Sequence, residues 1–518
     1  MAVITSPLPP LVRRDQSITE RVFEGLAHDP DRVALIDGPT GASLTARALR
    51  DRIERLAGGL QARGVGPGTI VAIFAPNMPD YAVVFHAAAY AGATITTINP
   101  TYTAHEVAVQ LKDSGATWLF TLPTLMLPAL MPVVSEAVQP LGPLHVVMMD
   151  GGLDALMGPP LAGQVPVDVD LDVLALPYSS GTTGLPKGVR LTHRNLVANV
   201  DQVLAGLEVR QGEMTVAFLP FFHIYGMNVL INLFLAGGAG LVTMPRFDLA
   251  AFLTHVQTHA MRLVLIAPPV AVALAKHPLV DQFDIRSVQV IMSGAAPLGG
   301  DVAAAVGARL NCMVMQGYGM TELSPVSHIS PLPGFKAGSV GILMPGTEAR
   351  IVDPVSGKDL GPGQEGELWL KGPQVMLGYH NAPDSTLWAL NEGWLRTGDL
   401  AAFDADGHFF IRDRLKELIK VSGFQVALAE VEQELLACPA VADAAVLGLP
   451  DAETGQRVVA FIVPQPGPVP DLSEVQAFLA DRLTTFKRPG EIRLVQSIPK
   501  SASGKILRRV LKAQALGV

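Results

Sequence analysis

The densest group of reactive side chains in the sequence is one run of eleven residues, Tyr178-Ser179-Ser180-Gly181-Thr182-Thr183-Gly184-Leu185-Pro186-Lys187-Gly188. Glycine backbone N–H groups, clustered hydroxyls and a lysine ammonium are the groups that hold polyphosphates. The spacing of a Walker A loop, which ends in Gly-Lys-Ser/Thr, is absent. We therefore predict a polyphosphate-binding loop of another type, with an ordinary Ser/Thr/Gly turn as the structural alternative.

Other segments carry the charges that a reaction at a phosphate needs. Glu322 is a candidate Mg²⁺ ligand with Thr321 beside it on the phosphates, although such a pair also caps helix N-termini. Lys505 ends a Ser-Ala-Ser-Gly-Lys stretch, which predicts that a loop presents its ammonium. From Arg482 onward there are nine Lys or Arg and one acidic residue. This basic end would suit phosphates, and a solvated surface is the alternative.

Composition limits the class of protein that positions these groups. The chain has 518 residues, 49% of them hydrophobic and 16% charged, so at least two folding units with real cores are expected. A net charge of −9 argues against a nucleic-acid partner. Two cysteines and an N-terminus without a continuous apolar stretch favour the cytoplasm. The uncharged stretch 214–245 contains Pro, His, Asn and a glycine cluster, which predicts core rather than a membrane span, so no membrane partner is expected.

The order of patterns along the chain predicts an α/β protein. Apolar strand-like runs alternate with helical patterns up to about residue 300, which is typical of parallel sheets covered by helices. From Gly338 to about Phe410, short strands separated by glycine predict an antiparallel, barrel-like unit. A smaller α/β pattern follows Leu415. Its expected elements are a helix at 429–437, strands at 442–448 and 457–464, and a helix at 473–483.

The run at 178–188 resembles the phosphate-binding signature of the adenylate-forming superfamily, which includes acyl-CoA synthetases, firefly luciferase and the adenylation domains of peptide synthetases. The segments 218–225 and 293–298 look most like 4-coumarate:CoA ligase and its bacterial relatives. The other motifs follow in the order of that family: Gln316-Gly317-Tyr318-Gly319-Met320-Thr321-Glu322, Gly366-Glu367-Leu368, Gly393-Trp394-Leu395-Arg396-Thr397-Gly398-Asp399, Asp413-Arg414-Leu415-Lys416-Glu417 and Pro499-Lys500-Ser501-Ala502-Ser503-Gly504-Lys505.

The resemblance implies a domain organisation. A large N-terminal domain of stacked α/β sheets with the barrel-like subdomain, residues 1–415, would bind the nucleotide and the acid. Residues 416–518 would form a small mobile α+β lid that turns about the hinge residue Lys416. One pose of the lid would bring Lys505 inward for adenylation, and the other would bring the segment 420–425 inward for acyl transfer.

The resemblance also implies roles for single residues, with ATP and Mg²⁺ as cofactors. Tyr318 would stack on adenine, Asp399 and Arg414 would bind the ribose, and Lys505 would bridge the substrate carboxylate and the α-phosphate. Glu322 would be the metal ligand. The expected catalytic residues are Lys505, Lys420 and His223. The expected cofactor-binding residues are Ser179, Ser180, Gly181, Thr182, Thr183, Gly184, Lys187, Tyr318, Gly319, Thr321, Asp399, Arg414 and Gln425.

For the carboxylic acid, the resemblance indicates a pocket that contains no Lys, Arg, Asp or Glu. The buried part of the acid should then be uncharged, and cyclic, aromatic or of medium size and apolar. Ser324, Ser327 and His328 depart from the plant enzymes' glycine and aliphatic residues, which argues against coumarate itself. The expected lining residues are His223, Tyr225, Ser293, Gly294, Gly317, Pro325 and Val326.

A second departure concerns the group that accepts the acyl chain. Typical CoA ligases read Ile-Lys-Tyr-Lys-Gly-Phe-Gln, whereas this chain reads Ile419-Lys420-Val421-Ser422-Gly423-Phe424-Gln425, so an aromatic ring and a cation are missing. CoA remains the expected acceptor. The alternative is an amino-acid amine, as in amide ligases similar to coronafacic acid ligase. A luciferase-type oxygenase and a silent acyl-ligand binder are further alternatives, and the presence of Lys505, Glu322 and Asp399 disfavours the silent binder.

Overall fold

A computed structural model describes residues 3–126, 130–139, 143–179, 186–331, 334–415, 417–421, 424–451, 454–467, 470–480, 482–501 and 504–516. Its first sheet is built on continuous apolar strands. β4 (Ile70–Phe74) lies between β5 (Thr94–Ile98) and β6 (Trp118–Thr121) and is parallel to both. Strands of this kind are buried on both faces, as the sequence predicts. The other strands are β7 (His145–Met148), β8 (Val173–Ala175), β9 (Tyr178–Ser179), β10 (Lys187–Thr192) and β20 (Gly378–Tyr379).

Helices that cover these sheets begin where the sequence supplies caps. α1 (Ile18–Ala27) begins at a capping box made by Ser17 and Glu20. α4 (Ala104–Ser114) begins at a capping box and ends at Gly115, whose φ of +76° needs glycine. The remaining helices of this part are α2 (Ala46–Gln61), α3 (Pro79–Tyr90), α5 (Leu130–Val138), α6 (Met149–Gly152), α7 (His193–Gly206), α9 (Leu249–Thr258), α10 (Pro268–Lys276) and α11 (Gly300–Leu310), with short 3₁₀ turns η1 (Pro123–Leu125), η3 (Asp154–Leu156), η5 (Pro278–Gln282) and η6 (Thr321–Leu323).

Two further sheets complete the part of the chain before residue 345. The four-stranded sheet has the order β11 (Met214–Ala217), β12 (Gly240–Thr243), β2 (Val33–Asp37) and β3 (Ser43–Thr45). In the other sheet, β13 (Leu263–Ile266), β14 (Val290–Ser293) and β15 (Met313–Gly319) are parallel. Antiparallel β16 (Val326–Ile329) and β17 (Ile342–Leu343) extend that sheet from β15.

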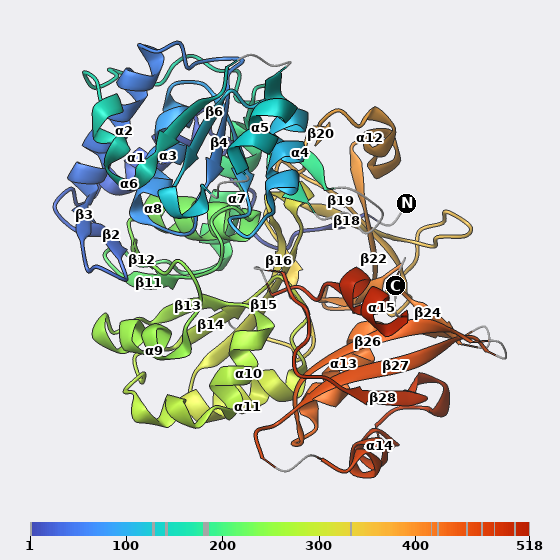
Figure 1. Ribbon diagram of the computed structural model, residues 1–518. Coiled ribbons are helices and arrows are strands. Elements are labelled where there is room, and N and C mark those ends of the chain that lie inside the picture. The colour runs from blue at the N-terminus through green and yellow to red at the C-terminus, as the bar shows by residue number, and fades with distance from the viewer. Residues whose placement is uncertain are drawn as a thin grey trace.

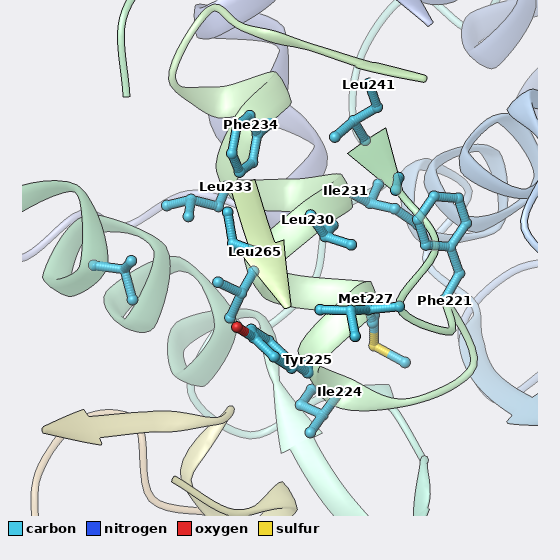
Figure 2. Close-up of a cluster of buried hydrophobic side chains, with 14 of the residues drawn as sticks. Phe221, Ile224, Tyr225, Met227, Leu230, Ile231, Leu233, Phe234, Leu241 and Leu265 are labelled. Atoms are coloured by element: carbon cyan, nitrogen blue, oxygen red, sulfur yellow. The ribbon is translucent and has the colours of Figure 1, made fainter. Parts of the chain in front are cut away.

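The uncharged stretch 214–245 is core, as predicted. Between β11 and β12 it forms the π-helix η4 (Tyr225–Asn232) and α8 (Leu233–Ala236), and every residue of both helices is buried. Figure 2 shows Phe221, Met227, Leu230 and Ile231 packed together, with Tyr225 at one end of the cluster. Within the described part of the chain, every helix is too short or too polar to cross a bilayer.

The predicted antiparallel unit is a six-stranded sheet. Its order is β1 (Ile4–Thr5), β18 (Glu348–Val352), β19 (Gly366–Lys371), β22 (Trp394–Phe403) and β21 (Leu390–Asn391), and β23 (Phe409–Arg414) also pairs with β22. Among the described residues the pairing does not close into a ring. α12 (Pro383–Ala389) lies between β20 and β21 in the sequence. The α/β class is confirmed.

The residues after 415 form a smaller unit around two long strands, at the lower right in Figure 1. Side chains of β26 (Val441–Asp451) and β27 (Gly455–Pro464) alternate between two faces, as the strand period requires. Val446 and Ile462 face α13 (Leu428–Ala437) and α14 (Leu472–Ala480), whereas Leu447 packs with Leu511 of α15 (Arg508–Leu516). The sheet also contains β24 (Ile419–Val421), β25 (Phe424–Val426) and β28 (Glu491–Leu494), with η7 (Thr485–Lys487) before β28.

Candidate active site

One cavity of about 570 Å³ collects residues from most of the segments that the sequence singles out. Its wall includes the end of β15, the loop after β14, the start of η4, β20, α12 and the loop that carries Lys505. Segments almost 330 positions apart in the sequence therefore meet at one site. The predicted site residues that line it are Ser179, Lys187, His223, Tyr225, Gly294, Gly317, Tyr318, Gly319, Thr321, Glu322, Pro325, Val326, Arg414 and Lys505.

At one end of the cavity, a hydrogen bond and an ion pair join Tyr318, Asp399 and Arg414. The Tyr318 hydroxyl donates to Asp399 Oδ2 at 2.6 Å, and Arg414 Nε lies 3.2 Å from Asp399 Oδ1. Strands β22 and β23 place Asp399 opposite Arg414. Burial raises the pKa of the Asp399 carboxyl, and the Arg414 guanidinium opposes that rise. Asp399 lies behind Tyr318, so the side chains that face the cavity here are Tyr318 and Arg414.

Glu322 and Lys187 lie next to the described part of the predicted phosphate loop. Glu322 Oε1 accepts hydrogen bonds from the Tyr379 hydroxyl at 2.8 Å and from Ser179 Oγ at 3.3 Å. Lys187 Nζ is 5.3 Å from the centre of the Tyr379 ring and donates to Ser385 Oγ at 2.9 Å. Tyr379 thus contacts the candidate metal ligand and the loop cation together.

The single carboxylate of Glu322 fits a metal ion whose other ligands come mainly from substrate phosphates and water. The described residues contain no group of three or more His, Cys, Asp or Glu that could hold a metal ion. Glu322 is nevertheless buried, and its carboxylate faces the cavity. Mg²⁺ keeps several waters and commonly takes one or two protein carboxylates together with substrate phosphates. One carboxylate beside a phosphate loop is consistent with that mode of binding.

The other end of the cavity is apolar. Tyr225 and Val229 of η4 face Met292 at the end of β14, and the Tyr225 hydroxyl is 3.5 Å from the Met292 carbonyl oxygen. Gly294 lies under the Tyr225 ring, because a Cβ added there would be 3.0 Å from Tyr225 Cε1. A Cβ added at Gly317 would be 2.5 Å from Met292 Cε. A side chain at either position would therefore require a shift of the Tyr225 ring or of the Met292 side chain, both of which line this end of the cavity.

Lys505 and His223 face the cavity and interact electrostatically. Burial, reinforced by the Arg414 charge, lowers the pKa of the Lys505 ammonium. Burial and the Lys505 charge lower the pKa of His223 to about 4, so this imidazole is neutral near pH 7. Its Nδ1 accepts a hydrogen bond from the Tyr225 backbone N–H at 3.3 Å. The positive charge beside the neutral His223 ring therefore comes from Lys505, which can interact with an anionic substrate group.

Comparison with known proteins confirms the family. The family model for AMP-binding enzymes matches residues 22–380, and the model for the C-terminal domain of AMP-binding enzymes matches residues 430–505. The chain belongs to the AMP-binding enzyme family. A rice (Oryza sativa subsp. japonica) protein named 4-coumarate--CoA ligase 5 is 40% identical to this member over 99% of its chain and 97% of the rice protein. The predictions of family, enzyme class and fold are therefore confirmed.

Solved structures of AMP-binding enzymes have the same fold. ATP-bound MatB from Rhodopseudomonas palustris is 28% identical, with a TM-score of 0.86, over 96% of this chain and 99% of that one. The amide bond synthetase McbA from Marinactinospora thermotolerans is 26% identical, with a TM-score of 0.82, over 96% of this chain and 99% of that one. Both similarities extend across nearly the whole length, so the C-terminal unit is included.

Some predicted residues lie away from the cavity or outside the described residues. Ser293 is buried beneath the wall, and no described group hydrogen-bonds its Oγ. Lys420 and Gln425 are paired on the hairpin of β24 and β25 in the C-terminal unit. Ser324, Ser327 and His328 are fully buried, and none lines the cavity. The predicted residues that the structure does not describe are Ser180, Gly181, Thr182, Thr183, Gly184 and Lys416.

The structure adds cavity residues that the motifs do not assign. Tyr379 lies in β20, Trp388 lies in α12, and Arg396 lies within a quoted motif without an assigned role. The Arg396 guanidinium carbon is 4.9 Å from the Trp388 ring centre and 5.2 Å from that of Trp369. The apolar end is extended by Val203, Leu207, Val229, Met292 and Ile329. Val203 lies on helix α7, and Leu207 directly follows that helix. The amphipathic pattern of α7 indicates that one face is buried, but it does not indicate a ligand.

The basic end after Arg482 differs from the expectation of a free phosphate-binding surface. Lys487 pairs with Glu430 at 2.7 Å, Lys500 with Asp443 at 2.6 Å, and Arg508 with Glu432 at 2.8 Å. These cations are neutralised by acidic residues that lie 57 to 76 positions earlier in the chain. A count of charges along the sequence could not predict these ion pairs, because it includes only neighbours in the chain and not partners that the fold brings close.

Proposed function

We propose that the chain is an ATP-dependent carboxylic acid ligase that forms an acyl-adenylate with release of pyrophosphate and then an acyl-CoA thioester. The observation that carries the proposal is the shared cavity. Lys187, Glu322 and Lys505 line the same space as Tyr225, Gly294 and Met292. A phosphate-binding end and an apolar acid-binding end are therefore open to each other, as a reaction between ATP and an apolar acid requires.

In the first step, a carboxylate oxygen of the acid attacks the α-phosphorus of ATP. The bond to the β-phosphate oxygen breaks, and pyrophosphate leaves with the electron pair. Lys505 would lie between the two anions, and Lys187 with Ser179 would hold the phosphates. Mg²⁺ bound at Glu322 would neutralise phosphate charge. Tyr318 would contact adenine, with Gly319 and Thr321 beside it, and Asp399 and Arg414 would orient the ribose.

In the second step, the CoA sulfur attacks the acyl carbonyl carbon and AMP leaves with the electrons of the broken C–O bond. We assign this step to a second pose of a lid formed by residues 416–518, which turns about Lys416 relative to residues 1–415. That motion would bring the hairpin with Lys420 and Gln425 to the cavity. The separate hydrophobic clusters of the C-terminal unit support a body that moves as a whole.

The acid is a cyclic, aromatic or medium-sized apolar carboxylic acid. Charged side chains at the apolar end are absent among the described residues, and an unpaired charge on the buried part of a substrate would be costly there. His223 would separate this end from the reacting carboxylate. The two cysteines are free thiols, which supports a reducing compartment such as the cytoplasm.

A second candidate function is transfer of the acyl group to an amino-acid amine. It is favoured by Val421, which packs against the core of the C-terminal unit where typical CoA ligases have tyrosine. The similarity to an amide bond synthetase over 96% of the chain supports the same alternative.

Competition between acceptors tests both candidates. The enzyme is incubated with ATP, Mg²⁺ and an aromatic acid, together with CoA and the twenty amino acids at equal concentration. The products are identified by mass spectrometry. Predominant acyl-CoA supports the proposal. Formation of an acyl-amino acid with selectivity for one amino-acid side chain would overturn the CoA ligase proposal and support the amide ligase instead. A screen of acids for pyrophosphate release without any acceptor tests the shared first step.

A further inference from the structure

Helix α10 lies next to the C-terminal unit at both of its ends. At its N-terminal end, a Cβ added at Gly504 would be 3.5 Å from Ala267 Cβ and 3.6 Å from Pro269 Cδ. Gly504 directly precedes Lys505, so this end of α10 supports the loop that inserts Lys505 into the cavity. At its C-terminal end, Lys276 Nζ donates to the carbonyl oxygens of Leu436 at 3.0 Å and Val441 at 2.9 Å.

The Lys276 ammonium lies at the C-terminal end of α13, a position that favours a cation. Leu436 lies in the last turn of α13, where carbonyl oxygens lack partners within the helix and the helix dipole is negative. At the other end of the same helix, Asp413 Oδ2 accepts hydrogen bonds from the backbone N–H groups of Leu428 and Ala429. α13 thus has a carboxylate at its N-terminus and an ammonium at its C-terminus, both complementary to its dipole.

We propose that Lys276 is a positioning residue for adenylation, which holds α13 against α10 so that Lys505 stays in the cavity. This rests on the proposed function, in which Lys505 acts on the first step. Lys276 is half-buried, and burial lowers the pKa of its ammonium. The carbonyl oxygens of Leu436 and Val441 therefore replace water molecules that the buried ammonium has lost. Without these acceptors, burial of the Lys276 ammonium would be unfavourable.

A polar contact between the neighbouring helix α11 and the C-terminal unit is weaker than the Lys276 contact. Arg482 pairs with Asp301, but their side chains are 37% and 62% exposed. Exposed pairs of this kind contribute little and are screened by salt. Gln433 of α13 lies beside Gly299, where an added Cβ would be 3.5 Å from the Gln433 side chain. Among the contacts that α10 and α11 make with the C-terminal unit, Lys276 is therefore the one whose loss should move the lid most.

The first test is kinetic and uses four variants of the full chain. Lys276→Met keeps the length of the side chain but removes the donors, and it should lower kcat for pyrophosphate release about tenfold with little change in KM for ATP. Lys276→Arg keeps a cation and should recover most of the rate. In a Lys505→Ala background, Lys276→Met should cause no further loss, because Lys276 acts through Lys505. Multiplied losses in the double variant would overturn the proposal.

The matched control is Lys512→Met on α15, since Lys512 is exposed and makes no hydrogen bond or ion pair among the described residues. It should leave pyrophosphate release unchanged. Reaction of a supplied acyl-adenylate with CoA should be unaffected by Lys276→Met, whereas a general loss of stability would slow both half-reactions.

A second test does not depend on activity. Amide hydrogen exchange of residues 428–437 and 504–507 should be faster in Lys276→Met than in the wild type or in Lys512→Met. Unchanged exchange would overturn the proposal even if the rate falls. If the wild type released no pyrophosphate with any acid, the proposed function would fail, and the exchange experiment would still decide whether Lys276 holds the lid.

Discussion

The two ends of the cavity are built in different ways. At the end of Tyr318, Glu322 and Lys187, nearly every side chain is held by a short hydrogen bond or an ion pair to a residue distant in the sequence. At the end of Tyr225 and Met292, the polar side-chain contacts found among the described lining residues are long. They are a 3.5 Å approach of the Tyr225 hydroxyl to a carbonyl oxygen and a 3.3 Å hydrogen bond from the Tyr225 backbone N–H to His223 Nδ1. Packing and free volume define that end.

This difference separates activation from selectivity. Phosphate chemistry depends on charges at fixed positions, because electrostatic stabilisation is strong only when the groups are oriented beforehand. Recognition of an apolar acid depends on shape, and each methylene changes binding by a modest factor. Substitutions at the polar end should therefore slow the reaction of every acid, whereas substitutions at the apolar end should change which acid is used.

The largest effect is expected at Lys505. Lys505→Ala should lower pyrophosphate release by about 10² to 10³ for all acids, the range for loss of one electrostatic stabiliser. A supplied acyl-adenylate should still react with CoA. Lys505→Ala and wild type are compared in both half-reactions by a pyrophosphate assay and by chromatography. Equal loss in the two half-reactions would contradict the hypothesis that Lys505 acts only in adenylation and that a second lid pose serves acyl transfer.

At the apolar end, Gly294→Val should lower kcat/KM for ring-bearing acids about 10- to 200-fold and leave short acids and the KM for ATP unchanged. The reason is that a Cβ at residue 294 is already 3.0 Å from the Tyr225 ring. Gly163→Val is the control, since no atom lies within 4 Å of a Cβ added there. Undiminished use of the bulkiest accepted acid would show that residue 294 does not limit the pocket.

Tyr379→Phe tests the polar network more gently. It removes the hydroxyl that donates to Glu322 Oε1 at 2.8 Å but keeps the ring beside Lys187. Pyrophosphate release should fall about tenfold for every acid, because a hydrogen bond to a charged group is lost. The Mg²⁺ concentration for half-maximal rate should rise, and titration calorimetry should show weaker binding of MgATP. An effect that differs between acids would contradict the separation of the two ends.

The smallest effect concerns protonation behind the polar end. His328 packs against Tyr318 and is fully buried, and burial lowers its pKa from 6.5 to about 3. Between these values the unfolded chain binds a proton that the folded chain does not, so stability falls as pH decreases from 6.5 towards 3. The contribution is up to about 1.4 kcal/mol per pH unit.

His328→Asn should therefore flatten the dependence of the unfolding free energy on pH between 4 and 6, measured by urea titration. The exposed His105→Asn should leave that dependence unchanged. His86 and His193, with pKa values lowered to about 3 and about 4 by burial, keep part of the acid sensitivity in both variants. Identical pH slopes for His328→Asn and the wild type would show that His328 is protonated in the folded protein.

Much of the fold follows from local pattern. The strand at 70–74 is apolar at every position and is buried, and the uncharged stretch 214–245 is core as its Pro, His and Asn content predicts. The helix expected at 429–437 is observed at 428–437. The roles expected for Lys505, Glu322 and Tyr318 came from motif order, and these three residues do meet in one cavity.

By itself, the sequence determined the family and the fold class, because those depend on short motifs and on periodicity that each segment carries alone. Only the tertiary structure showed that Tyr379 contacts both Glu322 and Lys187, and that Val203 and Leu207 line the apolar end of the cavity. It also showed that Lys276 donates a hydrogen bond to the last turn of α13. It also decided that Lys487, Lys500 and Arg508 of the basic end are paired with acids of their own unit. The physical reason is that such contacts join side chains up to hundreds of positions apart, and their distance is set by how sheets and helices pack.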